Sequence, residues 1–136
     1  MTEYVLDTNH VTRLLSGADP LRQRVQAAVT TGDRFGITMS ILGEMYYAAY
    51  ASQRRDENLH AIRAFLADIW LWPYDERAAE EFGRIQAEQK VKGRPIPQID
   101  AQIAAVVRLQ RLTLLTADQH FQSVAGLTIE NWLMAD

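Results

Sequence analysis

Two acidic residues of this chain follow short apolar runs that have the composition of buried β-strands. Asp7 comes directly after residues 4–6, and Asp118 comes two positions after residues 112–116. Open α/β sheets bind ligands at the carboxyl ends of their strands, so both carboxylates are candidates for metal or substrate chemistry. Each also has a structural alternative, because Asp7 can cap a following helix and Asp118 can occupy a turn.

Two further acids, Glu44 and Asp100, lie in segments whose spacing predicts helices. The residues three, four or seven positions away on the same helical faces are apolar or aromatic: Ile41, Tyr47 and Ala48 for Glu44, and Ile103, Ala104 and Val107 for Asp100. A carboxylate on an apolar face is costly to bury unless it is paired or bound to a cation. The alternatives are a surface acid on an imperfectly amphipathic helix for Glu44 and a helix-capping acid for Asp100.

Brought together, these four acids would form a site for a hard divalent cation. Neighbouring carboxylates repel one another unless they are protonated or neutralised. The chain has no cysteine, and we expect no histidine to face inward, so the ligands are oxygens, which select Mg²⁺ or Mn²⁺. Such ions activate water and stabilise the leaving oxygen in phosphodiester cleavage. Asp7, Glu44, Asp100 and Asp118 are therefore predicted as catalytic and metal-binding residues.

The segments that carry these acids predict an α/β fold, in which a parallel sheet of about four to five strands has helices on both faces. Strands and helices alternate along the chain, as they do in parallel sheets covered on both sides. We expect strands at residues 4–6, 35–39, 69–72, 112–116 and 127–130. We expect helices at residues 8–15, from 19 onward, at 41–51, 56–67, 75–91 and 98–110, and a helical turn at 118–124. Thr8 and Ser40 are the expected N-caps of two helices. No linker or repeat interrupts residues 1–136, which predicts a single domain.

The composition narrows the class of function. The formal net charge is −3, which is not the basic character of a protein that binds nucleic acid through charge alone. No apolar run approaches the roughly 20 residues of a transmembrane helix, and residues 1–7 lack the basic start of a signal peptide. The absence of cysteine excludes disulfides and fits a cytoplasmic protein with no membrane contact.

A few basic and histidine side chains are candidates for contact with a phosphate backbone. Arg13, Lys92 and Arg94 could hold such a backbone, although Lys92 and Arg94 also fit a solvated helix end, where positive charge complements the helix dipole. His10 and His120 lie within three positions of two of the acids. They are candidates for phosphate binding or proton transfer.

The sequence around each acid resembles a segment of PIN-domain proteins, and in particular of the VapC toxins of toxin–antitoxin pairs. Residues 4–9 (YVLDTN) are similar to the family's apolar strand followed by Asp-Thr-Asn or Asp-Thr-Ser. Residues 38–48 (TMSILGEMYYA), 96–105 (IPQIDAQIAA) and 114–121 (LLTADQHF) resemble the second, third and fourth acidic segments. The four segments occur in order at ordinary spacing. One departure is His120, at a position where an acid is common.

This resemblance implies a PIN-like fold and an endoribonuclease that hydrolyses RNA phosphodiester bonds with water activated by Mg²⁺ or Mn²⁺. Asp7 and Asp100 would bind the metal directly, and Glu44 and Asp118 would complete its ligands or hold water. The donors that orient these carboxylates would be Thr8, Asn9 and Thr116. The resemblance also implies a toxin that forms a homodimer and is inhibited by a cognate antitoxin protein.

Three other functions match the sequence less well. A PIN-like domain that binds RNA or protein partners without cleavage would lack one of the acids, and none is missing. A metal-dependent phosphatase of the haloacid dehalogenase type needs an acid two positions after Asp7, where this chain has Asn9. A receiver domain needs an acidic pair on its first strand and a lysine after its last strands, and Lys92 is the final lysine of this chain.

Overall fold

The computed structural model describes residues 1–17 and 19–133, and within them the strands form one parallel sheet in the order β3-β2-β1-β4-β5. The strands are β1 (Glu3–Leu6), β2 (Arg34–Thr38), β3 (Trp70–Trp72), β4 (Thr113–Leu115) and β5 (Thr128–Glu130). The helices are α1 (Thr8–Leu15), α2 (Asp19–Thr30), α3 (Met39–Ala51), α4 (Arg55–Leu66), α5 (Glu76–Lys92) and α6 (Gln98–Gln110), with a 3₁₀ helix η1 (Gln119–Ser123). The expected α/β fold with a parallel sheet is confirmed.

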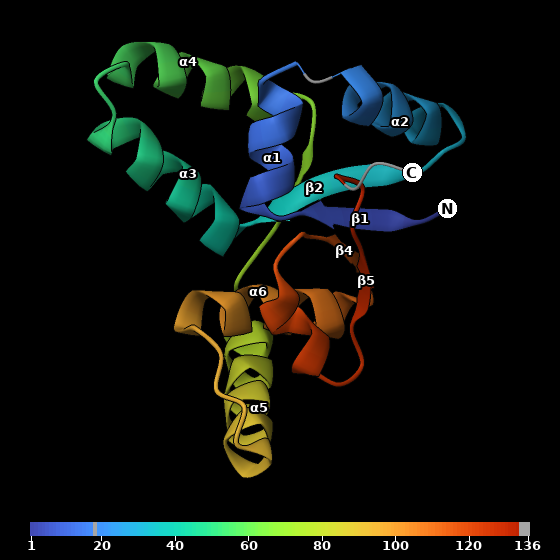
Figure 1. Ribbon diagram of the computed structural model, residues 1–136, viewed down its shortest axis with the longest axis vertical. Helices are drawn as coiled ribbons and strands as arrows, with labels where there is room; N and C mark the ends of the chain where they lie inside the picture. The colour runs from blue at the N-terminus through green and yellow to red at the C-terminus, as the bar shows by residue number, and fades with distance from the viewer. Residues whose placement is uncertain (18, 134–136) are drawn as a thin grey trace.

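The helices lie on both sides of the sheet. Figure 1 shows α1 to α4 on one side and α5 with α6 on the other, and β1 runs between its neighbours β2 and β4. The chain therefore leaves β1 toward one edge of the sheet and returns through α6 to the other side of β1. This is the kind of strand-order reversal at which open α/β sheets bind ligands.

Burial on both faces explains why the central strands are continuous apolar runs. Val5, Leu6, Ile37, Leu114 and Leu115 have no exposed surface. The edge strand β3 differs, because Trp70 and Leu71 remain exposed there. The core is thus centred on β1, β2 and β4, the strands whose carboxyl ends carry or precede the predicted site residues.

Two predicted helix caps are wrong. Asp7, and not Thr8, is the N-cap of α1, since its Oδ1 accepts a hydrogen bond from the backbone N–H of Thr8 at 2.8 Å. Thr38, and not Ser40, caps α3, because its hydroxyl accepts from the backbone N–H of Ile41 at 3.3 Å. The helix α3 therefore begins two residues earlier than predicted, because the last residue of β2 supplies the capping oxygen, whereas α1 begins at the predicted residue.

A half-buried ion-pair network fixes α6 against α5. Arg108 donates from Nε to Oε2 of Glu81 at 2.6 Å and from Nη1 to Oε1 of Glu88 at 2.9 Å. The buried Gln89 donates from Nε2 to the carbonyl oxygen of Arg94 at 2.9 Å, which holds the loop between the two helices. This scaffold determines where the first turn of α6 lies. No helix among the described residues is long and apolar enough to cross a membrane.

Candidate active site

The junction of β1 and β4 forms the first part of the site. Leu6 pairs with Leu115, so Asp7 and Thr116 leave the sheet side by side. The hydroxyl of Thr116 donates to Oδ2 of Asp7 at 2.6 Å, and its oxygen accepts from the backbone N–H of Asp118 at 3.0 Å. One buried hydroxyl therefore fixes the positions of both acids that follow strands.

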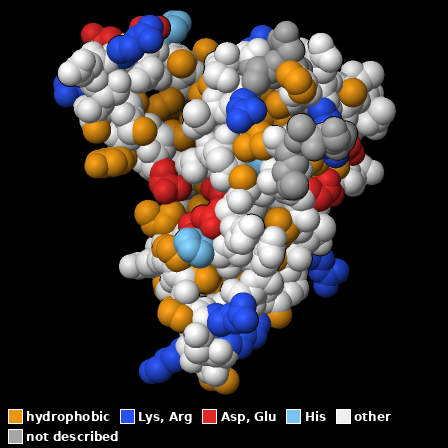
Figure 2. Space-filling model, viewed as in Figure 1, with side chains coloured by type: hydrophobic (Ala, Val, Ile, Leu, Met, Phe, Trp, Pro, Cys, Tyr) orange, Lys and Arg blue, Asp and Glu red, His pale blue; other side chains and the backbone are white. Residues whose placement is uncertain are grey.

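Glu44 and Asp100 approach the same edge from helices on opposite sides of the sheet. The helix α3 starts directly after β2, and α6 starts after the loop that follows α5. Oγ of Ser40 donates to Oε1 of Gln102 at 3.0 Å and joins the first turns of these two helices. Figure 2 shows acidic side chains and a histidine gathered in the hollow between the upper helices and the lower pair.

The environments of the two helical acids differ from each other. Asp100 is half-buried, and Ile103 on its face is fully buried, as expected. The expectation of a buried apolar stripe beside Glu44 is wrong, because Tyr47 on that face is 76% exposed. Tyr47 and Ile99 instead line an open groove of about 580 Å³ that includes Glu44. The apolar face of α3 is therefore buried at Ile41, before Glu44, and exposed at Tyr47, after it.

The charges of the acids raise one another's pKa values. Burial, followed by the charges of Asp7 and Asp100, raises the pKa of Glu44. Burial also raises the pKa of Asp100, where the charges of Asp118 and Asp7 act in the same direction and the hydrogen bond with His120 opposes them. The pKa of Asp7 is raised by burial and by Asp118, against the hydrogen bonds from Thr116 and Thr8. The folded chain thus holds mutually repelling carboxylates together.

No lysine or arginine within residues 1–17 and 19–133 forms an ion pair with any of these four acids. Glu81 provides the contrast in the same molecule. Its burial acts to raise its pKa, but hydrogen bonds from Arg108 and Arg84 outweigh the burial and lower it. Glu81 and Glu88 are thus paired with Arg108, whereas the acids of the site have no arginine or lysine partner among the described residues.

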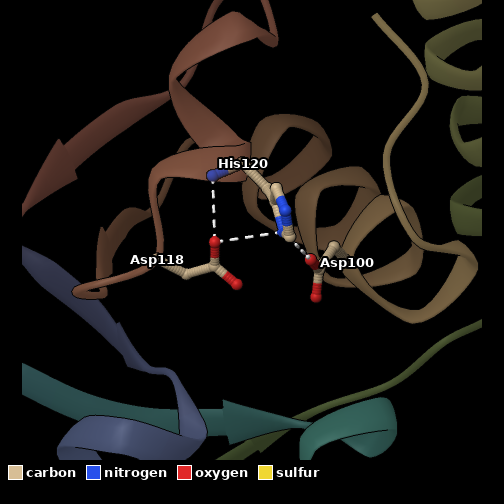
Figure 3. A group of neighbouring side chains, drawn as sticks. All are labelled: Asp100, Asp118 and His120. Carbon is tan, nitrogen blue, oxygen red and sulfur yellow. Dashed lines mark hydrogen bonds and ion pairs between the residues drawn. The ribbon is translucent and has the colours of Figure 1, made fainter.

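His120 is the residue of the site that the sequence did not place correctly. Its Nδ1 lies 3.1 Å from Oδ2 of Asp100 and 3.1 Å from Oδ1 of Asp118, so the expectation that no histidine faces inward is wrong (Figure 3). Its position two residues after Asp118 made it a candidate, but the direction of the ring depends on the turn that Asp118 caps.

His10 has no direct access to substrate, which corrects its prediction as a phosphate or proton-transfer residue. It is fully buried, and its Nε2 accepts from the backbone N–H of Trp132 at 3.0 Å. Its Nδ1 lies 2.6 Å from Oδ1 of Asn9, which makes Nδ1 the protonated nitrogen. Burial, followed by the charge of Arg13, lowers the pKa of His10 to about 4. The neutral ring therefore links Asn9 to the backbone of Trp132 through two hydrogen bonds.

The remaining predicted residues lie around Asp7 and along η1. Asn9 donates from Nδ2 to Oδ2 of Asp7 at 3.5 Å, and Thr8 contacts Asp7 through its backbone N–H. Lys92 donates from Nζ to the carbonyl oxygen of Ser123 at 2.8 Å, which holds its charge beside η1. The exposed Arg94 and His120 line a groove of about 460 Å³, and the exposed Arg13 lies in the last turn of α1.

The donor set fits a divalent cation of the Mg²⁺ or Mn²⁺ class. The carboxylates are half-buried or buried, lie close enough to repel one another, and lack a basic partner other than His120 among the described residues. Donor atoms of Asp100, Asp118 and His120 lie within 4.8 Å of one another. Oxygen-rich clusters of this kind bind hard cations, whose positive charge offsets the repulsion between the carboxylates.

Comparisons with known proteins identify relatives over almost the whole chain. A family model described as "PIN domain" matches residues 4–127. The chain is 32% identical over 133 residues to the tRNA(fMet)-specific endonuclease VapC of Shigella flexneri, covering 97% of this chain and 99% of that protein. It is 31% identical over 134 residues to ribonuclease VapC2 of Haemophilus influenzae, covering 98% and 100%. A structure of DNA-bound VapBC from Salmonella typhimurium matches with a TM-score of 0.88 and 28% identity, over 97% of this chain and 99% of that one.

The neutral His10 predicts a specific loss of stability in acid. Its pKa is lower in the folded chain than in the unfolded one, so its contribution is complete above about pH 6.5 and is lost as the pH falls toward 4. Between pH 8 and pH 5, we expect the free energy of unfolding to fall by about 2 kcal/mol more for the unaltered chain than for His10→Gln. Urea unfolding at both pH values measures this difference.

The exposed His60 gives the control, since His60→Gln should retain the full pH dependence. The raised pKa values of Asp7, Glu44 and Asp100 increase the free energy of unfolding as the pH falls, which opposes the effect of His10. This contribution is the same in all three proteins. Equal pH dependence in the unaltered chain and His10→Gln would contradict the account of His10.

The repulsion among the acids predicts that a divalent cation stabilises the fold. At 100 times its dissociation constant, Mn²⁺ should raise the free energy of unfolding by about 2.7 kcal/mol. Asp100→Asn should be more stable than the unaltered chain without metal, because one repelling charge is gone, and should gain little when Mn²⁺ is added. Thermal or urea unfolding with and without the ion measures both effects.

Asp68→Asn is the matched control, because Asp68 is exposed and follows α4 away from the site. Its free energy of unfolding should rise with Mn²⁺ by as much as that of the unaltered chain. A cation effect that is equal in Asp100→Asn and in Asp68→Asn would show that the ion binds elsewhere.

Proposed function

The chain belongs to the PIN domain family, and from that premise we propose that it is a metal-dependent endoribonuclease and the toxin of a toxin–antitoxin pair. The observation that carries the proposal is the convergence of Asp7, Glu44, Asp100 and Asp118 without a lysine or arginine partner among the described residues. Relatives at 31–32% identity over nearly the full length are named as a tRNA(fMet)-specific endonuclease and a ribonuclease. RNA in the cytoplasm is the proposed substrate.

Asp7, Asp100 and Asp118 would hold the divalent cation, with Glu44 completing the ligands or positioning water. When bound, the cation supplies a Lewis acid that polarises the phosphodiester and makes water a stronger nucleophile. None of the hydrogen bonds found within residues 1–17 and 19–133 involves the Glu44 carboxylate, unlike those of the other three acids. Glu44 is therefore the acid whose oxygens are free to orient a water molecule.

Other residues of the chain set the direction of the carboxylates. Thr116 donates to Oδ2 of Asp7, and the backbone N–H of Thr8 donates to Oδ1, so both oxygens of Asp7 are oriented. Asn9 adds a longer contact of 3.5 Å to Oδ2 and accepts from the backbone N–H of Ala117 at 3.3 Å. These donors hold the ligand in place before the cation binds, which reduces the reorganisation that binding requires.

The RNA backbone is proposed to pass along η1 and the loop after α5. Arg94 and Lys92 bring positive charge to this side of the acids, and Arg94 shares a groove with His120. Arg13 is proposed as a contact on the other side, beyond α1. Because the net charge is −3, the cation and these local charges would supply the attraction for phosphate.

Two protein partners are proposed: an antitoxin and a second copy of this chain. The match to a solved VapBC complex supports the antitoxin. An apolar groove of about 850 Å³, lined by Leu15, Val25, Val29 and Trp70 among others, offers it a surface between α2 and α4.

The exposed Tyr47 and Tyr50 on α3 support a homodimer, which sedimentation of the chain alone would test against its mass of 15.5 kDa.

Metal-dependent RNA cleavage is the test of the enzymatic proposal. The purified chain should cleave RNA with Mg²⁺ or Mn²⁺ and lose cleavage in EDTA. Asp7→Asn should lower the rate by more than about 100-fold, because loss of an outer donor alone costs about 10–100-fold and Asp7 is a proposed ligand. Initiator tRNA belongs among the substrates, since a relative is named for it.

Asp68→Asn should cleave at the rate of the unaltered chain. Binding of RNA without cleavage by the folded chain would favour a PIN domain that only binds. Hydrolysis of a small phosphate monoester in place of RNA would favour a phosphatase. Cleavage that persists in Asp7→Asn or in EDTA would exclude the proposed mechanism.

The apolar groove predicts how antitoxin binding can be separated from catalysis. Val29 is 53% exposed in the groove, so Val29→Asp should weaken the complex with the protein encoded beside this chain and relieve inhibition of RNA cleavage. Burial of the exposed half of this valine accounts for about 0.8–1.5 kcal/mol, and the carboxylate of the variant adds a desolvation cost, so affinity should fall at least about tenfold. Val91→Asp, at an 89% exposed position of α5, is the control and should leave inhibition unchanged. Equal inhibition of both variants would contradict this assignment of the groove.

A further inference from the structure

We propose that His120 supplies an imidazole nitrogen to the divalent cation held by Asp100 and Asp118, and that this nitrogen gives the site a preference for Mn²⁺ over Mg²⁺. The inference rests on the proposed metal-dependent function and goes beyond it. It concerns a residue at which this chain departs from the acidic pattern that it otherwise resembles.

The positions of the three donor atoms match adjacent ligands of one ion. Nδ1 of His120 lies 3.1 Å from Oδ2 of Asp100 and 3.1 Å from Oδ1 of Asp118. Neighbouring ligands of an octahedral ion at about 2.1 Å are separated by about 3.0 Å, so both distances have the length of an octahedron edge. Figure 3 shows the imidazole between the two carboxylates, with Nδ1 directed toward them.

The backbone of His120 is held by hydrogen bonds on both sides, although 56% of its side chain is exposed. Oδ1 of Asp118 accepts from the backbone N–H of His120 at 2.9 Å and caps η1. Oγ of Ser123 donates to the carbonyl oxygen of His120 at 3.2 Å, and the next residue, Phe121, is fully buried. Asp118 and His120 are thus held as one unit, and that unit is joined to Asp7 through the hydroxyl of Thr116.

A nitrogen ligand changes which ion the site prefers. Mg²⁺ binds oxygen ligands almost exclusively and keeps several waters, whereas first-row transition ions accept imidazole. Three or four carboxylates still make the site rich in oxygen, which suits Mn²⁺ among those ions. The other explanation of the geometry is an ion pair between a charged imidazole and the two carboxylates, in which His120 would not contact the cation. The experiment below separates the two.

Electron paramagnetic resonance of bound Mn²⁺ detects ligand nitrogen directly. In the unaltered chain, the bound ion should show hyperfine coupling to an imidazole nitrogen. His120→Asn places an amide oxygen near the position of Nδ1, so it should still bind Mn²⁺ but without that coupling. Calorimetry should show that the ratio of Mn²⁺ to Mg²⁺ affinity falls by at least about tenfold in His120→Asn. His60→Asn, at an exposed position of α4, should retain both the coupling and the ratio.

Each other outcome overturns the proposal. Mn²⁺ bound without nitrogen coupling in the unaltered chain, or with coupling that persists in His120→Asn, would mean that His120 is not a ligand. If RNA cleavage then still requires a metal ion and Asp7, the proposed function stands while this inference fails. If the folded chain binds no Mn²⁺ at all, the metal-dependent function fails together with the inference.

Discussion

The hydrogen bond from the Thr116 hydroxyl to Asp7 connects the sheet to the chemistry of the site. It joins the residues that directly follow β1 and β4, and the same oxygen accepts the backbone N–H of Asp118. Because β1 and β4 pair in parallel, with Leu6 opposite Leu115, the sheet itself brings these groups to one edge. The positions of Asp7 and Asp118 therefore depend on strand pairing more than on loop conformation.

The cluster is held together against its own electrostatic repulsion. Burial and neighbouring charge raise the pKa of Asp7, Glu44 and Asp100, and each of these shifts opposes the charged state at neutral pH. The molecule has arginines that could relieve such repulsion, and it uses them between α5 and α6, where Arg108 contacts Glu81 and Glu88. That network secures α6 and with it the first turn that contains Asp100. The acids that join α5 to α6 are thus paired with an arginine, whereas the acids of the site keep their mutual repulsion.

A large part of this arrangement could be predicted from local sequence. The apolar runs before Asp7 and Asp118 identified strands, and the order of elements identified the parallel sheet. Helix starts were less predictable, because Thr38 and Ser40 are equally good capping residues and the structure uses the one at the strand end. Periodicity did not show that Tyr47 stays exposed beside Glu44, since which face of a helix is covered depends on distant elements.

His10 and His120 show that the direction of a site side chain, too, could not be predicted from local sequence. Both lie near an acid in sequence, yet one is fully buried under Trp132 and the other faces two carboxylates. The difference comes from the helices that carry them: the ring of His10 faces the core, and the turn capped by Asp118 directs His120 to the strand ends. A two- or three-residue spacing cannot distinguish these outcomes without the fold.

The central claim is that Asp7, Asp100 and Asp118 share a divalent cation, and anomalous diffraction from crystals grown with Mn²⁺ tests it most directly. The account predicts an anomalous peak within about 2.2 Å of carboxylate oxygens of Asp7, Asp100 and Asp118. A well-ordered crystal with no peak among these residues, or with Mn²⁺ bound only at other acids, would contradict it.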